Sequence, residues 1–141
     1  MLLLLCAGIT HAQVLKVTPN FPGEDDTVTI IFNAALGNGG LKNFTSPVFA
    51  HTGLITTKSS SGTDWKYVQG TWGTFDNKVL MTSLGNNEYR IKFHLRSFYG
   101  LPSGEKALKM AFVFRNQDGS KVGREADGSD IFYTINSFSI Y

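Results

Sequence analysis

The stretch covering residues 107–135 constrains the fold of this chain most, because two apolar strand patterns there flank turns rich in Asp and Gly. Between residues 109 and 115, apolar side chains occupy both alternating sets of positions, which is typical of a central strand with two buried faces. The sequence Asn-Gln-Asp-Gly at residues 116–119 contains the Asp-Gly pair that tolerates positive φ in a tight hairpin turn. Residues 130–135 alternate again and predict a closing strand.

Strand signals recur along the rest of the chain at intervals of about ten residues. They are short runs bounded by turn-forming residues, and they lie at residues 14–18, 27–33, 47–56, 64–72, 79–84 and 88–95. Gly85-Asn86-Asn87 predicts a hairpin between the last two runs. Residues 96–106 predict an exposed crossing loop, and no segment has a convincing helical period. The pattern predicts an all-β fold, an immunoglobulin-like antiparallel β-sandwich of about seven to nine strands.

Composition indicates one domain and narrows the range of partners. With 141 residues, of which 42% are hydrophobic, the chain is long enough for one core and too short for two ordinary domains. The net charge is only +2, and lysine and arginine are scattered without a basic run. We therefore do not expect nucleic acid as a partner.

The first twelve residues predict a secretory signal peptide and not a part of the fold. An apolar run with four consecutive leucines precedes the small residues that a signal peptidase prefers, which predicts cleavage after Ala12 and a β-sandwich domain over residues 13–141. The apolar run, about nine residues long, is too short to span a bilayer. We expect a secreted, periplasmic or cell-surface protein without a membrane span. Because the one cysteine, Cys6, lies in this segment, the mature chain is expected to lack disulfides and thiol chemistry.

The motifs of the chain do not match an arrangement typical of catalysis. A nucleophile with its base, or a pair of carboxylates aimed at one bond, is not recognisable in them. His51 and His94 are far apart and have no metal-ligand spacing; His94 is expected to face solvent, whereas His51 is either a structural residue or a ligand contact. Asp118, Asp127 and Asp130 either form turns or contact calcium, and they lack the order of a dedicated calcium loop. We predict a protein that is not an enzyme and needs no metal or cofactor.

Aromatic residues cluster between residues 64 and 73, and they are the best candidates for a binding site. Both tryptophans of the chain, Trp65 and Trp72, lie there with Tyr67 between them. On a regular strand Trp65 and Tyr67 project from one face about 7 Å apart, close to the spacing of successive sugar rings. Aromatic rings stack on sugar faces, and Lys66 and His51 are candidate polar contacts. The alternative is that these aromatic residues pack in the core, as tryptophans of β-sandwiches commonly do.

Several longer strings resemble a known family. They are VFAHTGLIT at residues 48–56, DWKYV at 64–68, SFYGLPSGE at 97–105, and MAFVFRNQDGSKVGR at 110–124 followed by DIFYTI. In this order they resemble the N-terminal β-sandwich domain of secreted alpha-amylase-family glycoside hydrolases from Bacteroidetes-type bacteria. The resemblance implies an immunoglobulin-like accessory domain, similar to starch-binding modules, that precedes a catalytic barrel. No barrel follows in this sequence, so it implies either a piece of a longer enzyme or a free-standing module, and no catalytic residue is carried over.

The aromatic cluster and the resemblance together predict a non-catalytic accessory module of a secreted glycoside hydrolase. It would bind an alpha-glucan such as starch through Trp65, Tyr67 and Trp72, with Lys66 and His51 as polar contacts. The alternative is a structural or interaction domain without sugar binding, whose aromatic surface packs on a C-terminal catalytic domain or on another protein. Flat, coplanar and exposed rings flanked by polar groups would favour sugar, whereas a broad apolar face would favour protein.

Overall fold

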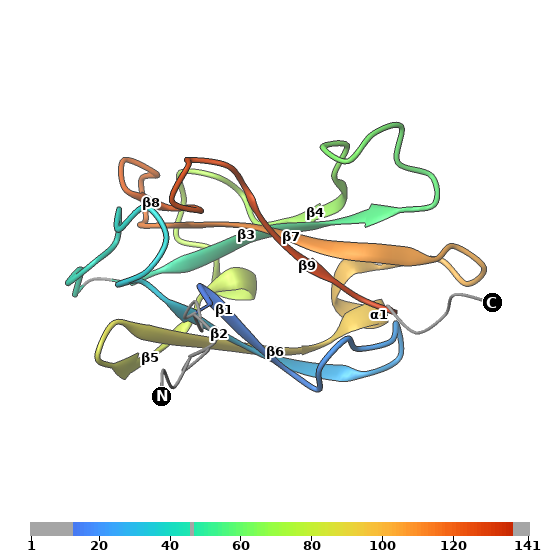
Figure 1. Ribbon diagram of the computed structural model, residues 1–141, viewed down its shortest axis with the longest axis horizontal. Helices are drawn as coiled ribbons and strands as arrows, with labels where there is room; N and C mark the ends of the chain where they lie inside the picture. The colour runs from blue at the N-terminus through green and yellow to red at the C-terminus, as the bar shows by residue number, and fades with distance from the viewer. Residues whose placement is uncertain (1–12, 46, 137–141) are drawn as a thin grey trace, which may run out of the picture.

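The computed structural model describes residues 13–45 and 47–136, which form two antiparallel β-sheets packed face to face (Figure 1). One sheet has the strand order β1-β2-β6-β5; the other has the order β4-β3-β7-β8, and β9 also pairs with β7. The elements are β1 (Leu15–Thr18), β2 (Thr27–Asn33), β3 (Phe49–Thr56), β4 (Lys66–Gln69), the 3-10 helix η1 (Asn77–Val79), β5 (Thr82–Gly85), β6 (Glu88–His94), α1 (Leu95–Tyr99), β7 (Ala107–Arg115), β8 (Val122–Gly123) and β9 (Ile131–Thr134).

The fold is the predicted all-β sandwich, and nine strands in the described part of the chain agree with the predicted number. We letter the strands in chain order as A, B, C, C′, D, E, F and G, where β4 is C′ and β8 and β9 together are G. The two sheets then have the orders ABED and C′CFG. This is the strand order of an immunoglobulin-like sandwich. The prediction of the fold class from strand spacing is therefore confirmed.

The predicted signal peptide, residues 1–12, lies outside the described residues. Among the residues that are described, no helix is both long and apolar enough to cross a membrane. Helix α1 has five residues and η1 has three.

The hydrophobic core lies between the sheets and follows from strand alternation. In β2, Val28, Ile30 and Phe32 are buried, whereas the residues between them are partly exposed. The neighbouring strand β6 contributes Ile91 and Phe93 to the same core. Because successive side chains of a strand point to opposite faces, each strand sends one apolar row inward.

Stacked phenylalanine rings join the two sheets. Phe32 of β2 lies against Phe114 of β7, with ring centroids 4.0 Å apart and planes inclined by 8°. Phe112 stacks beside Phe114 with centroids 5.4 Å apart. Gly123 of β8 leaves room for this stack, because a Cβ atom at Gly123 would lie 2.5 Å from Phe32 Cζ. The short strand β8 therefore fits against the core only with glycine at this position.

The predicted hairpins are confirmed. β5 and β6 pair around Gly85-Asn86-Asn87, whose three residues all have positive φ. β7 pairs with β8 beyond the Asp-Gly turn, and it is central as predicted, with β3 on one side and β8 and β9 on the other. The strand predicted at residues 79–84 begins later, at Thr82, because residues 77–79 form η1.

The expectation of an exposed crossing loop at residues 96–106 is wrong. Helix α1 occupies the start of this segment, its Tyr99 is buried, and Glu105 near the end of the segment is buried as well. His94, expected to face solvent, caps the helix: its Nδ1 atom accepts a hydrogen bond from Ser97 N (3.3 Å). A helix of five residues is too short to show its period in a sequence.

We expect Gly123→Ala to lower the free energy of unfolding by roughly 1–3 kcal/mol, because the added methyl group meets the Phe32 ring, which Phe114 holds in place. Urea denaturation would measure the loss. Gly62→Ala is the matched control, since a Cβ atom at Gly62 would have no heavy atom within 4 Å. Equal stability of the two variants would contradict the packing argument.

Candidate functional site

The five-stranded sheet has buried residues on its outer face as well as on its inner face. Phe49 of β3 and Ala111 and Val113 of β7 point outward, and all three are buried. A sheet face in contact with water would leave them exposed, so another part of the chain must cover it. Residues 64–76, which include β4, supply this cover; for example, the Phe75 ring meets the Phe49 ring edge-on, with centroids 5.2 Å apart.

A β-bulge in β4 changes the direction in which its side chains point. The register with β3 shifts between Thr52 and Leu54, and Tyr67 lies within the bulge at φ 54°, a left-handed conformation unusual for a bulky residue. Trp65 lies over Gly53 on the outer face, whereas Tyr67 packs against the core. The expectation that Trp65 and Tyr67 share one face is wrong, because the bulge interrupts the alternation.

Trp65 and Trp72 come together at His51 on the outer face of the sheet. The centroid of the His51 ring lies 6.1 Å from that of Trp65 and 5.2 Å from that of Trp72. The plane of the His51 ring is inclined by 34° to the Trp65 indole and by 89° to the Trp72 indole. Because these two angles differ by 55°, the two indole planes are inclined to each other by at least 55°. The two indoles therefore form an angled pair and not the coplanar platform that was expected to favour sugar. Trp65 is partly buried and Trp72 is 42% exposed.

A shallow depression of about 570 Å³ lies where the indoles and His51 meet. The rest of its lining comprises Val113 at its apolar side and the polar residues Thr63, Arg124 and Asp130. Arg124 Nη1 and Asp130 Oδ1 form an ion pair of 2.5 Å. This pair provides hydrogen-bond donors and acceptors beside the rings without adding net charge.

Thr63 and Arg124 were not expected from the sequence to belong to a site, and Asp130 was considered only as a turn residue or a calcium contact. β8 ends just before Arg124, and β9 begins just after Asp130. The chain between them leaves the sheet and returns beside its outer face, which brings both residues to the depression. The one signal in the sequence is that opposite charges flank the Asp-Gly turn at residues 127–128. Such charges are common in exposed turns, and they do not by themselves indicate a site.

The guanidinium group of Arg115, at the end of β7, holds the loop that carries Trp72. Arg115 is fully buried. Its Nη2 atom donates a hydrogen bond to the Thr71 carbonyl (2.9 Å) and its Nη1 atom to the Thr74 carbonyl (3.1 Å), so it binds the loop on both sides of Trp72. The Nη1 atom also donates to the carbonyls of residues 116 and 117, at 3.1 and 2.8 Å. One side chain thus joins the loop to the turn after β7.

Contacts on several sides hold the Trp72 indole in one orientation. The Arg115 Cζ atom lies 5.6 Å from the centroid of the Trp72 ring and 4.7 Å from that of Phe49. The indole also lies against Gly119, where a Cβ atom would collide with Trp72 Nε1. Burial lowers the pKa of Arg115, and the charge of Asp76 offsets this only in part. In the described part of the chain, Arg115 forms no ion pair, so main-chain carbonyls and rings are its partners.

His51 lines the depression as a neutral ring. Burial, and to a lesser extent the charge of Arg115, lowers the pKa of His51 below its ordinary value of 6.5, so the ring is neutral at pH 7. Its Nδ1 atom is buried and has no hydrogen-bond partner among the described residues. Unpaired buried N–H groups are rarer in proteins than unpaired acceptors, which favours the tautomer with the proton on Nε2. Nε2 is then the hydrogen-bond donor of this side chain.

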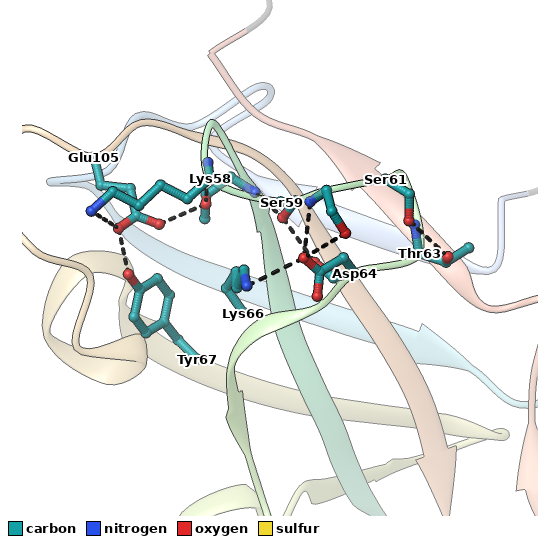
Figure 2. Close-up of polar contacts among 10 residues, drawn as sticks. Lys58, Ser59, Ser61, Thr63, Asp64, Lys66, Tyr67 and Glu105 are labelled. Carbon is teal, nitrogen blue, oxygen red and sulfur yellow. Dashed lines mark hydrogen bonds and ion pairs between the residues drawn. The ribbon is translucent and has the colours of Figure 1, made fainter.

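Tyr67 and Lys66 do not line the depression. Figure 2 shows the Tyr67 hydroxyl group pointing to Glu105 and the Lys66 ammonium group pointing to Asp64. The Tyr67 hydroxyl group donates a hydrogen bond to Glu105 Oε1, and Lys66 Nζ lies 3.2 Å from Asp64 Oδ2. Of the five side chains predicted to form the site, the structure brings together Trp65, Trp72 and His51 and separates the other two.

The buried carboxylate of Glu105 ties together the end of β3, β4 and the segment before β7. Besides Tyr67, Thr56 Oγ1 donates a hydrogen bond to Glu105 Oε2 (2.6 Å), and Lys58 Nζ lies 3.9 Å from Oε1. Burial raises the pKa of Glu105, but the hydrogen bonds from Thr56 and Tyr67, together with the charges of two nearby lysines, outweigh this effect and the pKa lies below its ordinary value. The Glu105 contact also raises the pKa of Tyr67. These pairings make the group a structural tie.

The three aspartates considered as calcium ligands have partners of their own. Asp118 Oδ1 accepts a hydrogen bond from Ser120 N (3.0 Å), and Asp127 Oδ1 accepts one from Ser129 N (2.9 Å). Asp130 forms the ion pair with an arginine described above. Within residues 13–45 and 47–136, no group of three or more His, Cys, Asp or Glu side chains could hold a metal ion.

Comparison with known proteins identifies a family. A model of the family described as Domain of unknown function (DUF8578) matches residues 15–122 of the chain. The chain belongs to this family. The matched region of the DUF8578 domain begins with β1 and ends in β8, so it contains both indoles, His51 and Arg115. No curated protein matches the chain.

We expect Arg115→Met to lower the free energy of unfolding by roughly 3 kcal/mol, because the carbonyl groups that Arg115 binds would lose their donor. Trp72 fluorescence should shift to longer wavelength as its loop loosens. Chemical denaturation and emission spectra would measure the two effects. Lys42→Met, at an exposed position, should change stability by no more than about 0.5 kcal/mol. An Arg115 variant as stable as this control would contradict the role assigned to the guanidinium group.

The pKa of His51 makes stability depend on pH in a defined window. As pH falls, the unfolded chain takes up a proton on this histidine at about pH 6.5, before the folded protein does. The free energy of unfolding should therefore decrease as pH falls from about 6.5 through the lower folded pKa. Urea denaturation at pH 7.5 and 5.5 would measure this decrease, which should be smaller in His51→Gln. Titration by NMR with a midpoint at or above 6.5 would contradict the assignment.

Proposed function

We propose that this DUF8578 domain is a non-catalytic accessory module that binds a neutral polysaccharide of the alpha-glucan class, such as starch. The binding surface in this proposal is the depression between Trp65 and Trp72, with His51, Arg124 and Asp130 as polar contacts. Tyr67 and Lys66 are left out because they do not line it. The observation that carries the proposal is the meeting of both tryptophans of the chain at one water-accessible depression bordered by polar groups.

The shape of the indole pair supports a curved ligand. Aromatic rings stack on the apolar C–H faces of sugars, and the two indole planes are inclined by at least 55°, since their angles to His51 are 34° and 89°. An alpha-1,4-linked glucan chain bends, so the faces of its successive sugar rings are not coplanar. The indole pair does not meet the criterion of coplanar rings, and it is compatible with a glucan only because such a chain bends.

The charges around the depression support an uncharged ligand. Arg124 and Asp130 neutralise each other across 2.5 Å, and burial keeps His51 neutral at pH 7. Arg115 is buried and forms its hydrogen bonds with main-chain carbonyls. Hydroxyl groups of a sugar can use the donors and acceptors that remain without the need for a counter-charge.

A secreted glycoside hydrolase is the context proposed for this module. The expectation rests on the apolar segment at residues 1–12 and on the resemblance to N-terminal domains of alpha-amylase-family enzymes. In that context the domain would hold the glucan near a C-terminal catalytic domain. The absence of a recognisable nucleophile and base in the motifs supports a binding role.

One observation favours a second function, a structural or interaction domain. Val68, Trp72 and Phe75 expose 43%, 42% and 48% of their surfaces, and all three belong to the segment that covers the sheet. Exposed apolar residues grouped in this way are typical of a surface that packs on another domain or protein. In this alternative no sugar binds, and Phe75 matters as much as Trp72.

Affinity electrophoresis in soluble starch would test the glucan proposal. We expect the wild-type chain to be retarded, and Trp65→Ala and Trp72→Ala each to bind about tenfold more weakly, since a lost ring contact costs roughly 1.4 kcal/mol. The matched control is Phe75→Ala, which removes an exposed ring that does not line the depression. It should be retarded like the wild type.

Two results would count against the proposal. Unchanged mobility of the wild-type chain at high starch concentration would rule out a functional glucan site. Loss of retardation in Phe75→Ala equal to that in Trp72→Ala would indicate a broad apolar contact surface and favour the interaction domain.

A further inference from the structure

Basic side chains that are far apart in the sequence meet on the outer face of the four-stranded sheet. Lys16 lies on β1, and Arg90 and Lys92 lie on β6. Their neighbours along each strand are buried in the core, so these three side chains point to the outer face. The sequence shows no basic run, and strand alternation alone brings these charges together.

The strand register sets their spacing. Lys16 pairs with Ile31 of β2, and Ile31 pairs in turn with Arg90, so the two basic residues lie in one row across three strands. Lys92 lies two residues further along β6, about 7 Å from Arg90 on the same face. Like charges at such distances repel each other, and a bound anion would relieve this repulsion.

These three side chains have no acidic partner in the structure. Among the described residues, Lys16, Arg90 and Lys92 make no side-chain hydrogen bond and no ion pair, whereas Arg96 and Arg124 are both paired with aspartates. Glu88, at the start of β6, is the carboxylate that shares this face of the strand. Its single charge leaves the face with a positive excess.

Part of this positively charged face is concave and forms a groove of about 620 Å³. Arg90, Lys92 and Lys78 line it together with the hydroxyl groups of Thr29 and Thr82. Lys78 is partly engaged, since its Nζ atom donates a hydrogen bond to a glutamine and lies over a phenylalanine ring. The groove therefore offers cations, hydroxyl groups and few apolar contacts.

We propose that this groove is a second binding site, which takes a polysaccharide bearing acidic groups. Arg90 and Lys92 would bind carboxylate or sulfate groups through charge-assisted hydrogen bonds, and Thr29 and Thr82 would bind sugar hydroxyls. None of the described residues that line the groove is aromatic, so it lacks the stacking surface typical of single-stranded nucleic-acid sites. The groove lies between the strands β2, β5 and β6 of the four-stranded sheet and the segment of η1, and it shares no lining residue with the depression at Trp65 and Trp72, so the two sites can be tested separately.

Affinity electrophoresis with polygalacturonate and with dextran sulfate would test this proposal at low and at physiological salt. Unsubstituted dextran is the neutral control, and single-stranded DNA is the control for another class of polyanion. We expect retardation by at least one acidic polysaccharide, weaker retardation by DNA, and none by dextran. The Arg90→Gln/Lys92→Gln double variant should bind the acidic polysaccharide about tenfold more weakly or worse.

A matched double variant separates a defined groove from net charge. Lys42→Gln/Lys121→Gln removes two exposed positive charges elsewhere and should bind like the wild type. An equal loss in both double variants would overturn the proposal, and so would DNA binding as strong as polysaccharide binding or no binding to either acidic polysaccharide. Trp65→Ala/Trp72→Ala should keep full retardation by the acidic polysaccharide, so this proposal and the starch proposal fail independently.

Discussion

The outer face of the five-stranded sheet has to be covered, and the rest of the structure depends on how the chain covers it. β7 lies between β3 and the strands β8 and β9, and six consecutive residues at its end are buried. The opposite sheet covers its inner face, and residues 64–76 cover its outer face. Arg115 holds that cover in place through main-chain carbonyls that accept hydrogen bonds from both of its Nη atoms, while its buried Nε atom has no partner among the described residues. One buried cation therefore joins the cover to the sheet.

Covering the sheet and presenting rings to a ligand are compatible roles for the same indoles. Trp72 contacts Gly119 and His51 and still exposes 42% of its surface. Because these contacts already hold the ring, a ligand would not need to order it, which lowers the entropic cost of binding at a shallow site. The four-stranded sheet needs no such cover, since most of its outward positions are polar or charged. Strand alternation thus produces two outer faces of different chemistry.

Strand alternation and turn composition were sufficient to predict most of the fold. The strand expected at residues 27–33 coincides with β2, and the strand expected at residues 88–95 exceeds β6 by its last residue. Both are recognisable because one buried face imposes a period of two on the sequence. The prediction fails where local geometry departs from this period. The strand expected at residues 64–72 shrinks to the four residues of β4, because the amides of Asp64 and Trp65 bond within the preceding turn and Gly70 follows the strand at a positive φ.

By itself the sequence determined the sandwich and its turns, and it identified both tryptophans and His51 as candidate site residues. Strand period, turn residues and aromatic clustering are all properties of residues that are close together in the chain. Only the tertiary structure decided that Tyr67 turns toward Glu105 and that Arg124 and Asp130 join the indoles. It also collected Lys16 and Arg90 on one face. The physical reason is that a bulge is defined by the register between two strands, and a shared face is defined by pairing across strands. Both depend on contacts between residues far apart in the chain.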